Sequence, residues 1–102
     1  MSEVTANELM LWWKSDIALK DAEAKSLINV SKEEIKVLKA KKGDINVSLE
    51  ERCIINHKIL KLDKIVKKAE ATLEINKIRM ADVERINQFL EEYQQNNQQN
   101  SP

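Results

Sequence analysis

The sequence predicts an all-α protein, an antiparallel helical hairpin packed like a coiled coil, with a kinked first arm and one long second helix. Its 102 residues include one glycine and one proline, the latter at the last position, so the chain lacks the turn residues that a multi-stranded sheet needs. Charged residues make up 33% and aromatic residues 4%, which is typical of long solvated helices. A heptad repeat of apolar residues runs through the second half.

Three capping boxes indicate where helices begin. In each, a Ser or Thr hydroxyl can accept a hydrogen bond from the backbone N–H of a Glu three residues later. The three pairs are Thr5 with Glu8, Ser31 with Glu34, and Ser48 with Glu51. We therefore expect helical segments over about 5–29, 31–42 and 48–95, with a break or kink at 29–31.

The turn between the two arms is predicted at residues 42–44, with Gly43 in the left-handed conformation that ends many helices. At about 1.5 Å per residue, the arms on either side would be about 55 and 70 Å long, so they can pair along most of their length. We expect residues 1–93 to form a single helical domain. The Gln/Asn-rich segment 94–102 contains no apolar residue, and it is expected to be disordered.

The heptad repeat predicts an apolar seam along the second arm. With Arg52 as the first a position, most a and d positions are apolar over five heptads, as in a coiled coil. Asn76 and Asn87 interrupt the seam, and a buried Asn can set register and partner number. The seam closes either within one chain or between the chains of a homo-oligomer. The predicted self-association seam consists of Ile55, Ile59, Leu62, Val66, Leu73, Met80, Val83 and Leu90.

The aromatic residues are candidates for binding another protein. If Trp13 lies on the apolar side of the first arm with Ile17, then Trp12 projects about 100° away, at the edge of that side or beyond it. Partly exposed tryptophan is enriched among interface hot spots, and Phe89 and Tyr93 belong to a second apolar row on the second arm. The alternative is that both tryptophans close the open end of the hairpin.

Charge is unevenly distributed along the chain. Residues 1–24 carry two Lys against five acidic residues, residues 25–68 carry twelve basic against six acidic, and residues 69–102 carry three against six. A hairpin places the basic segment at the turn, where it could meet the acidic end of a second molecule or a nucleic acid. The candidate basic patch comprises Lys36, Lys39, Lys61, Lys64 and Lys68.

Nucleic-acid binding is the alternative function. Proteins that bind nucleic acids usually add arginines, stacking aromatic residues or a strongly positive net charge. None of these accompanies the five lysines, and the formal net charge of the chain is zero. Lysines are also routine on the solvated faces of coiled coils.

Several other classes of function are not expected. Cys53 and His57 are spaced to share a metal ion, but a structural zinc site needs four ligands, so we expect no metal, no cofactor and no catalytic residue. The longest apolar stretch, residues 9–13, is far below the roughly 20 residues that span a bilayer. A single cysteine and no predicted signal peptide indicate the cytoplasm, which would be the host cytoplasm if the chain is phage-encoded.

The sequence therefore predicts a small non-enzymatic protein–protein interaction module that acts through helix–helix contacts. An adaptor, a chaperone, or an inhibitor or regulator of a larger complex would all fit, including one encoded by a phage or plasmid. Its expected partner is another protein, in a homo-oligomer or a hetero-complex.

Overall fold

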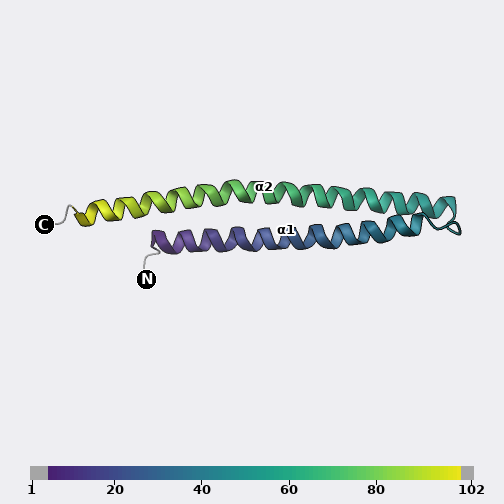
Figure 1. Cartoon of the computed structure of the whole chain (residues 1–102), viewed down its shortest axis with the longest axis horizontal. Coiled ribbons are helices and arrows are strands. Elements are labelled where there is room, and N and C mark those ends of the chain that lie inside the picture. Colours follow the sequence, from purple (N-terminus) through teal and green to yellow (C-terminus); the bar gives the residue numbers. More distant parts are fainter. Residues whose placement is uncertain (1–4, 100–102) are drawn as a thin grey trace.

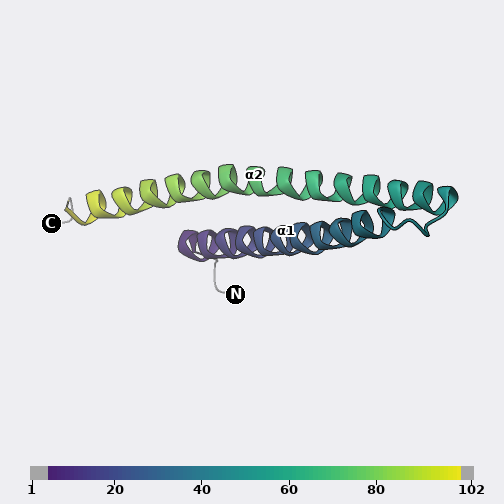
Figure 2. The same cartoon turned by 45° about the vertical axis from the view of Figure 1, so that its right-hand side comes forward.

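The computed structural model describes residues 5–99, and the side chains of residues 5–96. It contains two helices, α1 (Ala6–Lys42) and α2 (Leu49–Gln99). They lie side by side and antiparallel, with the turn at one end and the start of α1 and the end of α2 toward the other (Figure 1; Figure 2). The principal axes measure 84 × 27 × 14 Å, so the molecule is a single layer two helices wide. The predicted all-α antiparallel hairpin is confirmed.

Two of the three predicted capping boxes begin helices. The backbone N–H of Glu8 donates to Thr5 Oγ1 at 3.2 Å, and that of Glu51 donates to Ser48 Oγ at 3.1 Å. Each hydroxyl therefore satisfies a backbone donor that the first turn of its helix would otherwise leave without a partner.

The predicted break at residues 29–31 is wrong, because α1 is one continuous helix of 37 residues. Ser31, the expected cap, faces α2 and is only 3% exposed. Ile28 and Ile35 belong to the same buried cluster on either side of it. An uninterrupted helix keeps all three residues on the side that faces α2, so burial prevails over a local capping signal.

The turn also differs from the prediction, because Gly43 has φ −75° and is right-handed. Its N–H donates to the carbonyls of Lys39 and Ala40, both at 3.2 Å. Asp44 then redirects the chain: its Oδ1 accepts from the N–H of Asn46 at 3.0 Å, an Asx turn that supplies the reversal without a left-handed residue.

α2 is longer than the sequence predicts and extends past the start of α1 (Figure 1). The segment expected to be disordered from residue 94 is helical up to Gln99, while residues 100–102 lie outside the described part of the chain. Gln is a fair helix former, and Pro102 is the first residue after Gly43 that breaks helices. The side chains of residues 91–96 are all exposed.

The seam between the helices follows the heptad register predicted for α2. Every a and d position from Arg52 to Leu90 is buried or half-buried, and these residues pack against α1 of the same chain. A large cluster occupies the turn half and a smaller one the open half. From α1 the buried residues are Met10, Ile17, Ala24, Ile28, Ser31 and Ile35.

Met10, rather than the expected Trp13, occupies the seam at the open end. Met10 is 6% exposed and packs in one cluster with Ile17 and Val83, whereas Trp13 is 44% exposed. The small residues Ala24 and Ser31 lie at heptad spacing from Met10, and they face α2 as well. This rotation of α1 leaves Trp13, three positions after Met10, at the edge of the seam.

The two capping serines should respond differently to the same substitution. We expect Ser48→Ala to lower the free energy of unfolding by about 1 kcal/mol, because the cap of α2 is lost. Ser31→Ala should not lower it, because alanine is the better helix former inside a helix. Urea unfolding followed by circular dichroism, at one fixed protein concentration, measures both. Equal losses would indicate that α1 is interrupted at Ser31.

Gly43→Ala should stabilise the protein. An added Cβ would lie 3.5 Å from the carbonyl oxygen of Ala40, an ordinary van der Waals distance, and the negative φ of Gly43 suits alanine. Alanine reduces the conformational entropy of the unfolded chain relative to glycine, so we expect the free energy of unfolding to rise by about 0.4–1 kcal/mol. A decrease in the same urea experiment would show that Gly43 is left-handed in solution.

Candidate protein-interaction surface

The two flanks of the hairpin, on either side of the seam, differ in chemistry. In an antiparallel pair the g positions of both helices adjoin one flank and the e positions the other. Of the eighteen large apolar side chains that are exposed within residues 5–96, eleven lie at g or c positions of one flank, which we call the apolar flank. They are Leu9, Trp13, Leu27, Val30, Val37, Ile54, Ile65, Ile75, Ile86, Phe89 and Tyr93.

Cross-helix contacts establish that these residues share one side. Arg79 Nη2 of α2 lies 3.6 Å from Asp16 Oδ2 of α1, and both residues are at g or c positions. Trp13 of α1 and Ile86 of α2 line one groove of about 240 Å³. The apolar residues of both helices therefore form one surface along the hairpin.

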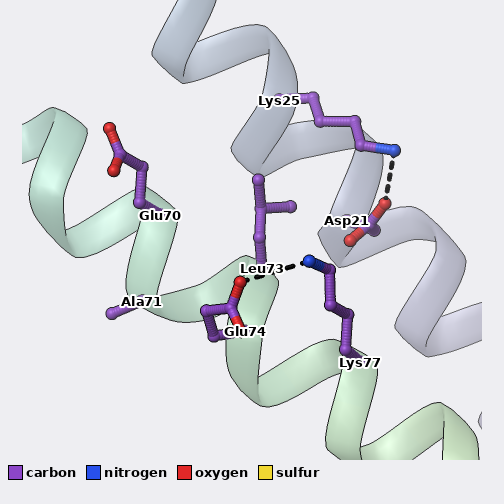
Figure 3. A pocket seen from close by; sticks show the side chains of 7 residues that line it. All are labelled: Asp21, Lys25, Glu70, Ala71, Leu73, Glu74 and Lys77. Atoms are coloured by element: carbon purple, nitrogen blue, oxygen red, sulfur yellow. Dashed lines mark hydrogen bonds and ion pairs between the residues drawn. The ribbon is translucent and has the colours of Figure 1, made fainter.

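The opposite flank, which we call the charged flank, carries few of the exposed large apolar side chains, Leu11 and Leu60 among them, whereas charged side chains occur on both flanks. It carries a groove of about 640 Å³, with Leu73 between the helices (Figure 3). Four of its charged side chains pair within their own helices: Lys25 Nζ lies 2.9 Å from Asp21 Oδ2, and Lys77 Nζ lies 3.2 Å from Glu74 Oε1. Such solvated ion pairs contribute little to binding or stability, and they suit a face that stays in water.

The predicted partner-binding residues all lie in the open half of the hairpin and are all exposed. They are the four aromatic residues of the chain, and their exposed fractions are 58% for Trp12, 44% for Trp13, 67% for Phe89 and 58% for Tyr93. Trp13 and Phe89 belong to the apolar flank, whereas Trp12 lies on the outer side of α1. Tyr93 follows Leu90, the last half-buried residue of α2. We call these four residues the aromatic end.

The lysines of the predicted basic patch are exposed but do not form one surface. Lys61 and Lys68 lie at c positions on the apolar flank, and Lys64 lies on the outer side of α2. Lys36 and Lys39 lie at b and e positions on the charged flank. The hairpin thus separates the lysines of its two arms, which weakens the case for a continuous phosphate-binding track.

Cys53 is a free, exposed thiol, and no group of three or more His, Cys, Asp or Glu side chains within residues 5–96 is arranged to hold a metal ion. Neither described helix has an apolar stretch long enough to cross a bilayer.

No family model, curated protein or solved structure matches this chain.

The apolar flank is the feature that sequence reasoning missed in α1, where Leu27, Val30 and Val37 are 47%, 62% and 64% exposed. Its signal is present in the sequence, because these residues fall at g and c once Met10, Ile17 and Ala24 are placed at d. The incorrect placement of Trp13 in the seam concealed it.

Asn76 is a polar residue inside the seam. It is 3% exposed, and its Nδ2 has no hydrogen-bond partner among the described residues. It lines one small groove with Ile17 and Met80. A buried amide without partners is costly, so its presence in the seam favours specificity of pairing over stability.

Replacing Asn76 with Leu should stabilise the hairpin. We expect the free energy of unfolding to rise by about 1–3 kcal/mol, because a polar group that is buried without a partner is removed. Asn87→Leu is the matched control: Asn87 is half-buried and its Nδ2 donates to Glu91 Oε1 at 3.4 Å, so its gain should be smaller. Urea unfolding compares the two, and a loss of stability for Asn76→Leu would show that the amide is satisfied in solution.

Proposed function

We propose that this chain is a non-enzymatic protein–protein interaction module that binds a foreign protein through the aromatic end. The observation that carries the proposal is the placement of the aromatic residues. All four lie at the open end, and each remains at least 44% exposed. Burying such side chains supplies a large part of the energy of protein interfaces.

The start of α1 supports the same proposal. Of the five consecutive apolar residues 9–13, Met10 packs against α2 and the other four are 38–63% exposed. A helix that is apolar on all sides is normally surrounded by protein. Because α2 can cover one side of α1, the remaining sides are available to a partner that encloses this end.

The kind of partner follows from the chemistry of the aromatic end. Its side chains are large and mostly apolar, and they project from regular helices in an open arrangement. An apolar helix or a hydrophobic groove of another protein complements such a surface. An adaptor, a chaperone, or an inhibitor or regulator would use the site in this way. As for the compartment, an exposed free Cys53 suits a reducing one such as the cytoplasm.

Nucleic-acid binding at the turn end is the second candidate. What favours it is the excess of lysine in the turn half, twelve basic against six acidic residues over 25–68. The separation of the lysines on opposite flanks argues against it. Phosphate contacts also lose affinity steeply with added salt, whereas an apolar aromatic interface does not.

Substitution of Trp12 tests the proposed function. A partner is first recovered with the wild-type protein and identified, and binding is then measured calorimetrically with both proteins purified. We expect Trp12→Ala to weaken binding by about 30-fold or more, as for an interface hot spot. Trp12 lies on the outer side of α1, so its replacement should leave the helicity of the hairpin unchanged.

Two further variants complete the test. Leu60→Ala is the matched control, because Leu60 is 61% exposed but lies at a b position on the charged flank, and its binding should equal that of the wild type. The combined Lys61→Gln, Lys64→Gln and Lys68→Gln variant addresses the second candidate. If this variant loses binding to duplex DNA or RNA while Trp12→Ala retains it, and no protein partner responds to Trp12→Ala, the proposed function is wrong.

A further inference from the structure

The hairpin exposes far more surface than a compact protein of its size. A compact 11.8 kDa protein exposes about 5900 Å², whereas this chain exposes 8362 Å². The difference of about 2500 Å² exceeds the roughly 800 Å² that each partner buries in a standard interface. The elongated hairpin as a whole therefore exposes more surface than one standard interface would cover.

A groove lies at the middle of this flank. It has a volume of about 440 Å³ and lies over Ala24 and Ala69. Leu27, Ile65 and Thr72 line it together with three charged residues, Lys20, Glu23 and Lys68. The small alanines leave the groove open, while Leu27 and Ile65 remain 47% and 39% exposed beside it. A surface that carries both a groove and apolar side chains at one point can be complementary to itself across a two-fold axis.

The position of the groove determines how two copies would align. Ala24 is the central residue of α1, which runs from Ala6 to Lys42. Consider a two-fold axis that passes through the groove and is perpendicular to the long axis of the hairpin. It places the region in which α1 and α2 are paired in one copy over the same region of the other copy. The turn of each copy then lies over the open end of its partner.

Charge favours the same alignment. The turn half, residues 25–68, has six more basic than acidic residues, while segments 1–24 and 69–102 each have three more acidic than basic. An antiparallel pair of hairpins places each basic half beside an acidic half. A parallel pair would place the two basic halves side by side, which like-charge repulsion disfavours.

We infer that the apolar flank binds a second copy of this chain, antiparallel and two-fold symmetric about the groove, so that two hairpins form a four-helix bundle. The seam predicted for self-association is occupied by α1, so the dimer uses a different surface. This inference does not depend on the proposed function. In the dimer, Trp13 and Phe89 belong to the covered apolar flank, whereas Trp12 on the outer side of α1 stays open to a foreign partner.

The mass of the full chain in solution tests the inference. Light scattering from about 1 µM to 1 mM, a range that covers moderate and weak dissociation constants, should give twice the 11.8 kDa of one chain. Ile65→Lys should raise the dimer dissociation constant by about 100-fold or more, because it places a charge in the interface. Leu60→Lys adds the same charge on the charged flank and should not change it.

The single cysteine reports the orientation of the two copies in the wild-type background. Cys53 is exposed, lies on the charged flank, and stands 16 residues along α2 from Ala69. Spin labels on the two copies of Cys53 should therefore be about 50 Å apart in the antiparallel dimer, and about 30 Å or less in a parallel one. Electron–electron double resonance measures this distance without any change to the apolar flank.

Several results would overturn the inference. A folded wild-type monomer throughout the concentration range would show that the flank is left for a foreign protein. A short label distance would exclude the antiparallel bundle, and equal weakening by Ile65→Lys and Leu60→Lys would place the interface elsewhere. Trp12→Ala should leave the mass unchanged, so failure of the dimer and failure of partner binding at the aromatic end are distinguishable.

Discussion

The seam between α1 and α2 is the interaction on which the rest of the molecule depends. Within residues 5–96, the buried apolar side chains all lie along it. A helix that packs against a single neighbour can bury only one stripe of its surface. Once Ala24, Ser31 and Ala69 face the partner helix, the apolar residues that lie outside the seam remain exposed. The exposed flank and the aromatic end are both consequences of this choice.

Much of the fold is readable from local sequence, because its determinants are local. The heptad pattern from Arg52 to Leu90 identifies the buried side of α2, and Thr5 and Ser48 mark the two helix starts, since a cap needs only its own first turn. Ser31 carries the same capping signature yet lies inside a helix. Whether such a residue caps a helix or is buried inside one depends on its contacts with α2. The local capping pattern contains no information about those contacts.

The rotation of α1 was harder to predict for the same reason. Its sequence offers two overlapping apolar stripes, one through Met10 and Ile17 and another through Trp13 and Leu27. Hydrophobicity favours the stripe with the larger side chains, but close packing of two helices favours the one with small residues at its centre. The candidate aromatic residues could be named from sequence, whereas the continuous apolar flank emerges only when both helices are placed in register.

The thinness of the hairpin links its association to its stability. Ordering a residue costs about 1–2 kcal/mol of backbone entropy, and a single seam with ten buried apolar side chains among the described residues offers a small core against that cost. Covering the apolar flank adds a second buried layer to both helices without lengthening the chain. Under the proposed dimer, helix formation and assembly reinforce each other, and Asn76 restricts which pairing of α1 and α2 is assembled. The aromatic end then projects from a bundle rigid enough to present it, which is the arrangement that a helix-based binding module requires.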